Sequence, residues 1–292
     1  MTERKTENII IKGIGGFYYV ETPDGVLEAR AKGIFRKRGI TPLAGDRVEV
    51  EESHGDYVVS VIHDRINYLT RPPVANVKNL FIVTSACEPS PNRAVTDMLT
   101  AIAVKCGILP AILVTKTDIA DASEFIADYR KAGFAVLDVS ADQDLGELCD
   151  MMSDGISVFE GNSGVGKSTL INRICPGLDL ETAAISRTLG RGKHTTRAVE
   201  LHHFGKGYIA DTPGFSSVDD ERLNWFLPEE LETLFPEFEP YRHDCFFTGC
   251  SHRVEKGCAV LAALNEGKIV PSRHRNYCSM YTAAKERQDN QY

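Results

Sequence analysis

The glycine-rich segment at residues 161–168, GNSGVGKS, has the residue types and the spacing of a phosphate-binding turn. In such a turn, backbone N–H groups converge on phosphate oxygens at the start of a helix, where the helix dipole also favours negative charge. Lys167 would place its ammonium on the β- and γ-phosphates, and the Ser168 hydroxyl would ligate Mg²⁺. The segment therefore predicts a site for a nucleoside triphosphate.

The local context supports this prediction. Residues 156–159 form a short apolar stretch typical of a strand, and residues 169–174 have the pattern of a helix. The residues expected to contact the phosphates are Gly161, Asn162, Ser163, Gly164, Val165, Gly166, Lys167, Ser168 and Thr169.

A second motif, TKTD at residues 115–118, follows another apolar strand pattern at residues 111–114. The Asp118 carboxylate can accept the ring N–H and the exocyclic amine of guanine together, whereas the ring nitrogen of adenine carries no proton. Alone, the tetrapeptide equally fits a strand end that leads into a helix cap. Ser140 and Ala141 follow the next strand pattern and would offer backbone N–H groups to the base carbonyl. The predicted base-binding residues are Thr115, Lys116, Thr117, Asp118, Ser140 and Ala141.

The segment DTPG at residues 211–214 supplies a further part of a nucleotide site. Asp211 would hold Mg²⁺ through a water molecule, and Gly214 would sense the γ-phosphate. An isolated segment of this kind could equally be a turn. Taken with the two motifs above, it specifies a guanine nucleotide, GTP or GDP, together with Mg²⁺.

Residues 189–197, LGRGKHTTR, lie between the phosphate motif and Asp211. Either Thr195 or Thr196 could complete the Mg²⁺ shell when γ-phosphate is present. Phe215 stands where many GTPases place the glutamine that orients the attacking water, and a phenyl ring cannot do that. His194 is the best-placed alternative base, so His194 and Lys167 are the candidate catalytic residues.

Four soft ligands follow near the C-terminus in the pattern C-x₄-C-x-H-x₅-C. Three thiolates and one imidazole fit a closed tetrahedral Zn²⁺ shell, which is the structural type of zinc site. Buried thiols or a disulfide are the competing interpretation. The predicted ligands of this one structural ion are Cys245, Cys250, His252 and Cys258.

The elements that must position these residues change character along the chain. Residues 8–66 show short strand patterns without a helix, which predicts a small barrel of the OB type, although an SH3-like barrel would look similar. From residue 79 onward strand and helix patterns alternate, which is typical of a parallel α/β sheet with ligands at the carboxyl ends of its strands. The basic run Arg36–Arg38 within the barrel, and the C-terminal helix pattern that carries Arg273 and Arg275, are candidate contacts with phosphate backbones.

The composition indicates a soluble globular protein but does not identify its function. The chain has 292 residues, 42% of them hydrophobic and 25% charged, as in soluble globular proteins. The net charge of −8 gives no whole-chain argument for nucleic acid, so local patches must carry that case. No apolar run approaches a membrane span and residues 1–8 are polar, so we expect a cytoplasmic protein that does not bind membranes.

The base motif precedes the phosphate motif, which is a circular permutation of the usual GTPase order. With an N-terminal barrel and a C-terminal zinc site, the chain resembles the ribosome small-subunit-dependent GTPase A family (RsgA, also called YjeQ or YloQ) over essentially its whole length. The resemblance implies an OB-fold domain at residues 1–68, a permuted GTPase domain at 69–222 and a zinc-binding domain at 223–292.

The same resemblance implies a monomer that binds the 30S ribosomal subunit and its 16S rRNA late in maturation, and whose GTP hydrolysis the subunit stimulates. The alternative is an rRNA-binding assembly scaffold that uses GTP as a structural ligand with little turnover. Phe215 agrees with the apolar residue that this family carries in place of the glutamine, and Thr115 departs from the asparagine of many GTPases.

Overall fold

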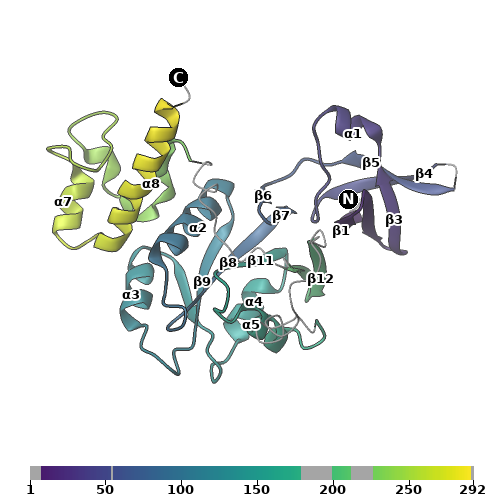
Figure 1. Cartoon of the computed structure of the whole chain (residues 1–292), viewed down its shortest axis with the longest axis horizontal. Coiled ribbons are helices and arrows are strands. Elements are labelled where there is room, and N and C mark those ends of the chain that lie inside the picture. Colours follow the sequence, from purple (N-terminus) through teal and green to yellow (C-terminus); the bar gives the residue numbers. More distant parts are fainter. Residues whose placement is uncertain (1–7, 54, 179–198, 212–225, 291–292) are drawn as a thin grey trace, which may run out of the picture. The chain divides into compact units, whose positions relative to one another are not determined.

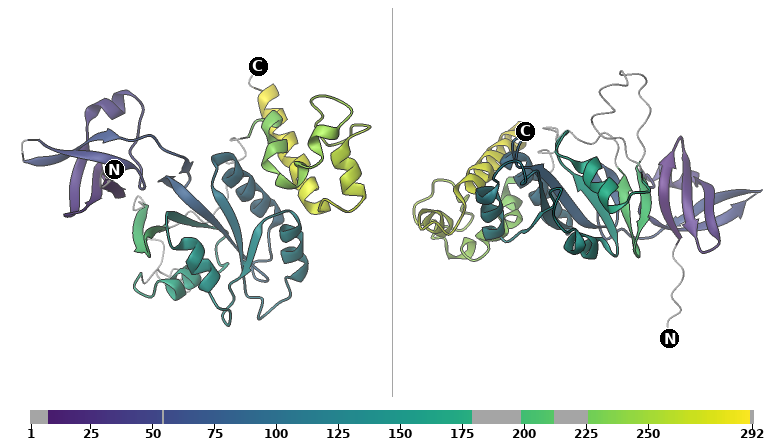
Figure 2. Two further views of the ribbon diagram at one scale, coloured as in Figure 1. Left: turned by 180° about the vertical axis from the view of Figure 1, so that it is seen from behind. Right: turned by 90° about the horizontal axis from the view of Figure 1, so that it is seen from below.

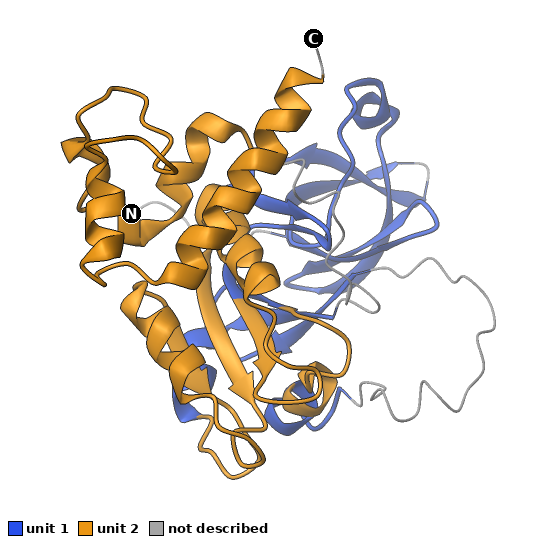
Figure 3. Cartoon of the chain, turned by 60° about the vertical axis from the view of Figure 1, so that its left-hand side comes forward, with its two compact units in different colours: residues 1–80, 146–159, 171–215 blue, residues 81–145, 160–170, 216–292 orange. Residues whose placement is uncertain are grey.

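The computed structural model describes residues 8–53, 55–178, 199–211 and 226–290. The chain forms two compact units (Figure 3). Unit 1 comprises Met1–Leu80, Gly146–Phe159 and Ile171–Phe215. Unit 2 comprises Phe81–Leu145, Glu160–Leu170 and Ser216–Tyr292. Within the described ranges, no helix combines the length and the apolar character that crossing a bilayer requires.

The first part of unit 1 is a small barrel, drawn in purple and blue in Figure 2. Its strands pair in the order β1-β2-β3-β5-β4, and pairing of β1 with β4 closes the ring. This closed five-stranded arrangement confirms the predicted OB-like barrel. The strands are β1 (Asn8–Ile14), β2 (Phe17–Thr22), β3 (Gly25–Ala31), β4 (Arg47–Ser53) and β5 (Asp56–Ile62).

The expectation of a barrel without a helix was wrong. The segment between β3 and β4 forms the short helix α1 (Gly33–Lys37), which buries Phe35 in the barrel core. Burial of the large apolar side chain of Phe35 favours this helical turn. The turn directs Phe35 into the barrel, while Arg36, Lys37 and Arg38 stay exposed. The core that Phe35 completes consists of Ile10, Val20, Ala29, Val48 and Val59.

The rest of unit 1 contains part of the α/β sheet. Strand β11 (Ile156–Glu160) runs parallel to β13 (Gly207–Asp211), which forms an antiparallel hairpin with β12 (Glu200–Phe204). Strand β12 also pairs with β1 of the barrel, and Lys12 forms an ion pair with Glu200 there. The unit further contains β6 (Tyr68–Thr70), β7 (Pro73–Ala75) and α4 (Gly146–Met152).

Unit 2 holds the elements that carry the base motif. Its strands lie in the order β10-β9-β8, with β9 and β10 parallel, as the alternating pattern predicted. Asn92 caps α2 by accepting a hydrogen bond from the Val95 N–H. The elements are β8 (Val77–Ser85, which begins in unit 1), α2 (Arg93–Cys106), β9 (Leu109–Thr115), α3 (Ser123–Lys131), β10 (Ala135–Asp138) and α5 (Lys167–Ile174, which ends in unit 1).

The C-terminal part of unit 2 is helical. Helix α8 packs against α2 and against the 3₁₀ helix η2, and Figure 1 shows α7 and α8 in green and yellow. The elements are η2 (Pro228–Leu234), η3 (Pro236–Phe238), η4 (Arg242–Asp244), α7 (Ala259–Asn265) and α8 (Pro271–Asp289).

Arg273 of α8 is not available to bind RNA, which corrects one sequence-based expectation. Its side chain is 1% exposed and forms ion pairs with Asp97 of α2 and Glu237 of η3. Burial opposes the charge, but the two carboxylates outweigh it and raise the pKa of Arg273 above its ordinary value. Arg273 therefore joins α8 to α2, while Arg275 remains exposed.

Candidate functional site

The phosphate motif forms the turn between β11 and α5 in the structure. Gly161 has a φ of +149°, and a Cβ atom there would lie 2.1 Å from the Val83 carbonyl oxygen. Only glycine fits this close approach, so the first position of the motif is required by packing against β8. Gly166 has a φ of +97°, which also favours glycine, and α5 begins at the next residue.

Lys167 is held inside its own loop. Its ammonium donates hydrogen bonds to the carbonyl oxygens of Gly161 at 2.6 Å and Asn162 at 2.8 Å. Burial lowers the pKa of Lys167 to about 8, although the nearby Glu160 carboxylate favours the charged form. The side chain is thus held against its own loop, and its charge depends on pH near the physiological range.

Two residues of the base motif contact the phosphate loop directly. The Thr115 hydroxyl donates to the Val165 carbonyl oxygen at 2.7 Å, and it also lies 3.2 Å from the Thr84 carbonyl oxygen. Lys116 has a φ of 61°, and its ammonium donates to the carbonyl oxygens of Gly164 at 3.1 Å and Glu88 at 2.5 Å. The structure therefore brings residues 115–116 and 164–165 together, although Thr115 and Val165 are 50 residues apart in sequence.

A second set of hydrogen bonds joins the two loops that are predicted to bind the base. The Thr117 hydroxyl donates to Asp138 at 2.6 Å, and the Thr117 N–H donates to the Ser140 hydroxyl oxygen at 2.8 Å. Asp138 also accepts from the Ser140 N–H at 3.0 Å. Burial opposes ionisation of Asp138, but these hydrogen bonds outweigh it and lower its pKa. Asp118 and Ala141, which follow these anchored residues, are exposed.

Asp138 is a residue that sequence reasoning missed. A carboxylate at the end of a strand is common, and its partner Thr117 lies 21 residues away in sequence. The only available signal was its place at the carboxyl end of a parallel strand, two residues before Ser140.

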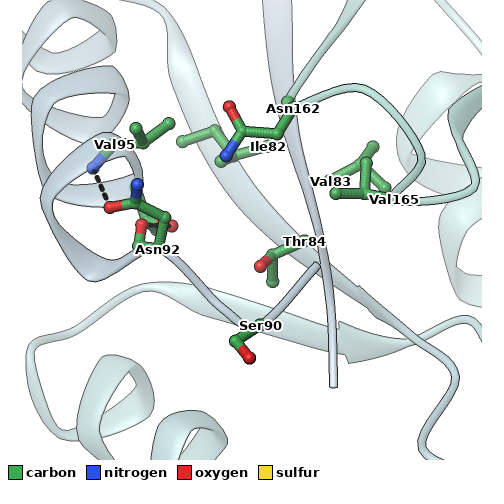
Figure 4. A pocket seen from close by; sticks show the side chains of 10 residues that line it. Ile82, Val83, Thr84, Ser90, Asn92, Val95, Asn162 and Val165 are labelled. Atoms are coloured by element: carbon green, nitrogen blue, oxygen red, sulfur yellow. Dashed lines mark hydrogen bonds between the residues drawn. The ribbon is translucent and has the colours of Figure 1, made fainter. Parts of the chain in front are cut away.

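A small hollow lies beside the phosphate loop, between β8 and the start of α2. Figure 4 shows Asn162, Thr84 and Ser90 around it, together with the hydrogen bond from the Val95 N–H to Asn92. Its volume of about 10 Å³ is close to the space of one water molecule. A nucleotide therefore does not fit this hollow.

The remaining predicted nucleotide contacts divide into two groups. Ser163, Ser168 and Thr169 belong to the turn and the first residues of α5, and Asp211 is the last residue of β13 in unit 1. His194, Thr195, Thr196 and Gly214 lie outside the described residues, as does Phe215.

The four predicted metal ligands form one cluster. The ligand atoms of Cys245, Cys250, His252 and Cys258 all lie within 4.8 Å of one another. The Nδ1 atom of His252 is 3.4 Å from the Cys258 sulfur and 3.5 Å from the Cys245 sulfur, and these two sulfurs are 3.8 Å apart. A cluster of this composition and spacing could hold a metal ion.

The turn that carries His252 is fixed by Glu255. His252 has a φ of 56°, which a non-glycine residue adopts only when its surroundings hold it there. Glu255 accepts hydrogen bonds from the backbone N–H groups of Ser251 and Arg253 and from the Ser251 hydroxyl. Burial opposes ionisation of Glu255, but these hydrogen bonds outweigh it and lower the pKa to about 2. Sequence reasoning named the four ligands and missed this support.

Two family models match the chain. The model described as the RsgA N-terminal domain covers residues 7–58, and the one described as RsgA GTPase covers residues 62–221. A small ribosomal subunit biogenesis GTPase RsgA from Geobacillus sp. (strain WCH70) is 43% identical, over 96% of this chain and 98% of that protein. The protein of the same description from Shouchella clausii is 41% identical, over 93% and 94%.

Solved structures agree with these matches. The crystal structure of YloQ, a circularly permuted GTPase, has a TM-score of 0.76 and 34% identity, covering 98% of this chain and 99% of that one. YjeQ from Thermotoga maritima has a TM-score of 0.77 and 29% identity, covering 96% and 98%. The family models together match residues 7–58 and 62–221, and the relatives align over nearly all of their length. This chain therefore belongs to the RsgA GTPase family.

Proposed function

We propose that this protein binds the small (30S) ribosomal subunit and hydrolyses GTP to GDP and phosphate in response to it, as a checkpoint late in subunit maturation. The observation that carries the nucleotide part is the direct contact between the base motif and the phosphate loop, made by the Thr115 hydroxyl on the Val165 carbonyl. The names of the relatives support the ribosomal part.

Guanine recognition is assigned to the two joined loops. Asp118 accepts the ring N–H and the exocyclic amine of guanine, and the backbone of Ser140 and Ala141 donates to the base carbonyl. The links through Thr117 and Asp138 support this assignment because they hold both loops in one arrangement. The aliphatic stem of Lys116 packs along the base.

Phosphate binding and hydrolysis are assigned to the glycine-rich turn, residues 161–169. Lys167 exchanges its carbonyl partners for phosphate oxygens and stabilises the charge that develops on them. Ser168, Thr195 or Thr196, and Asp211 through water would hold Mg²⁺, which would neutralise charge on the β- and γ-phosphates. Gly214 senses the γ-phosphate and His194 orients the attacking water.

The ion at the cysteine–histidine cluster is proposed to be one structural Zn²⁺. Tetrahedral Zn–S and Zn–N bonds of about 2.3 and 2.05 Å imply S···S and S···N separations of about 3.8 and 3.6 Å. The cluster has an S···S separation of 3.8 Å and S···N separations of 3.4 and 3.5 Å, which supports this identification. With all four positions supplied by protein, the ion has no open site for chemistry.

The partner is proposed to be 16S rRNA within the 30S subunit, bound by a monomer. The exposed basic residues Arg36, Lys37 and Arg38 on the barrel offer contacts to phosphate backbones, and Arg275 offers another on α8. Because the ribosomal subunit is a cytoplasmic particle, this function implies a cytoplasmic location and no membrane partner.

Phosphate release from GTP, measured with and without purified 30S subunits, tests the proposal. We expect many-fold stimulation by the subunit, loss of the stimulated rate in Lys167→Ala, and retention in Lys131→Ala, which changes an exposed lysine of α3. Turnover that stays at background when subunits are bound would instead support the scaffold that uses GTP as a structural ligand.

A further inference from the structure

The imidazole of His252 is engaged at both of its nitrogens. Its Nδ1 atom faces the sulfurs of Cys245 and Cys258, while its Nε2 atom lies 2.7 Å from the Oε2 atom of Glu232. The His252 side chain is 1% exposed, so water does not replace either partner. Glu232 is not one of the four clustered ligands and comes from η2, 20 residues earlier in the chain.

These contacts select one tautomer of His252. A nitrogen that binds a metal ion carries no proton, so Nδ1 facing the sulfurs requires the proton on Nε2. The Nε2–H group then needs an acceptor inside the protein, and the Glu232 carboxylate supplies one. An outer carboxylate in this position orients the ring and strengthens the ligand.

Glu232 lies on η2, a segment that also contacts the GTPase part of the chain. After Asp211 at the end of β13, η2 is the next element within the described residues. The segment is attached to α2 as well, because Glu230 forms an ion pair with Lys105 and Phe226 is buried near the same lysine. This segment therefore contacts α2 through Phe226 and Glu230, and it contacts the cysteine–histidine cluster through Glu232.

We propose that Glu232 is the outer-sphere positioning residue of the metal centre, and that the bound ion fixes η2 through His252 and Glu232. The ion then orders η2 in addition to its own loop. Within the described residues, η2 is the first element after Asp211. This inference rests on metal binding at the cluster, as proposed above.

Glu232 also forms an ion pair with Arg242, and the effect of this ion pair must be distinguished from that of the contact with His252. Arg242 lies 3.3 Å from Glu232 and 2.5 Å from Glu239, whose side chain is more exposed and which pairs with Arg242 and His243. Replacement of Glu239 therefore removes a partner of Arg242 and leaves the outer carboxylate in place, which makes it a matched control.

The experiment compares the full-length wild type with Glu232→Ala, Glu232→Gln and Glu239→Ala. Zinc affinity is measured by competition with a chromophoric chelator, and amide hydrogen exchange is followed in residues 227–234. We expect Glu232→Ala to weaken zinc binding about 10- to 100-fold, Glu232→Gln to recover part of this loss because its amide oxygen still accepts a hydrogen bond, and Glu239→Ala to match the wild type. Chelation of zinc from the wild type should speed exchange in residues 227–234, and Glu232→Ala should speed it with zinc bound.

Wild-type zinc affinity in Glu232→Ala, or exchange in residues 227–234 that does not respond to chelation, would overturn the inference. A wild type that binds no zinc would overturn the proposed metal site itself. These two failures are distinguished by the zinc content of the purified wild type.

Discussion

The loops of the predicted nucleotide site and the cysteine–histidine cluster are held together by different kinds of interaction. Each joins separate segments of the chain. Several separate hydrogen bonds join the loops of the predicted nucleotide site, among them Thr115 to Val165, Lys116 to Gly164 and Thr117 to Asp138. The cysteine–histidine cluster joins its segments with four ligands that converge on one point.

The difference lies in how each arrangement fails. A single hydrogen bond contributes about 0.5–1.5 kcal/mol net, so loss of one leaves the other links between the loops intact. A structural zinc ion in a small finger peptide contributes about 10–16 kcal/mol in apparent binding free energy, and this energy is folding energy. Loss of one ligand therefore threatens all the connections of the cluster at once.

Removal of a metal ligand should give the largest effect. We expect Cys250→Ser to lose bound zinc and to loosen residues 226–290, because the buried cluster holds η2, η4 and the start of α7 together. Zinc content and thermal unfolding measure this. Cys278→Ser is the matched control, since Cys278 lies on α8 outside the cluster. A Cys250→Ser protein with full zinc content and an unchanged melting temperature would contradict the model of a single cooperative centre.

Replacement of Asp118, the carboxylate proposed to bind guanine, should have a smaller effect that is confined to nucleotide binding. Asp118→Asn loses an ionised acceptor of two N–H groups, each hydrogen bond being worth about 1.5–3 kcal/mol, so GTP affinity should fall about 100-fold or more. Xanthosine triphosphate should bind better than GTP, because its extra carbonyl accepts from the new amide. Titration of both nucleotides measures this, with the exposed neighbour Asp142→Asn as the control. Equal loss for both nucleotides would show that Asp118 does not contact the base.

Sequence could predict the features whose residues are neighbours in the chain. The phosphate turn, the TKTD segment and the four clustered ligands each lie within a short stretch, so their residue types and spacing, taken together, were enough to propose their chemistry. Their supports could not be found in this way. Asp138 lies 21 residues from Thr117, and Glu232 lies 20 residues from His252, so only the fold shows that they meet.

The errors have the same physical origin. Arg273 looked like surface charge because its partners Asp97 and Glu237 lie 176 and 36 residues away. Helix α1 was missed because a five-residue turn shows too little periodicity to compete with the basic run beside it. In both cases tertiary packing decided the outcome, through an ion pair with α2 in one case and burial of Phe35 in the other.

The pH dependence of nucleotide binding tests the role of the Lys167 charge in the phosphate loop. Burial lowers the pKa of Lys167 to about 8, so its ammonium loses its proton as pH rises above this value. GDP affinity should therefore fall above pH 8 by up to about tenfold per pH unit, because a neutral amine does not attract phosphate. The sign for stability is opposite. The unfolded lysine titrates near 10.5, so the cost of burying the charge is present below pH 8 and is relieved as pH rises from 8 to 10.5.

Nucleotide titrations between pH 7 and 9.5 test this, with Lys167→Arg as the comparison. Arginine stays charged throughout the range, so the variant should show a flat profile whatever its absolute affinity. A wild-type profile that is also flat would mean that the lysine keeps its proton above pH 9, and that the carbonyl oxygens of Gly161 and Asn162 hold the charge more strongly than burial opposes it.

The smallest effect is expected at the link between the base-binding loops. Thr117→Val keeps the shape of the side chain and removes the hydroxyl that donates to Asp138, so GDP affinity should fall about 2- to 10-fold. Asp138→Asn should cost a similar amount because the amide no longer accepts at both oxygens. Since the two residues are joined by a direct hydrogen bond, the double variant should lose less than the product of the single losses. Fluorescence titration with labelled GDP measures all three variants, and strictly multiplicative losses would show that Thr117 and Asp138 position their loops independently.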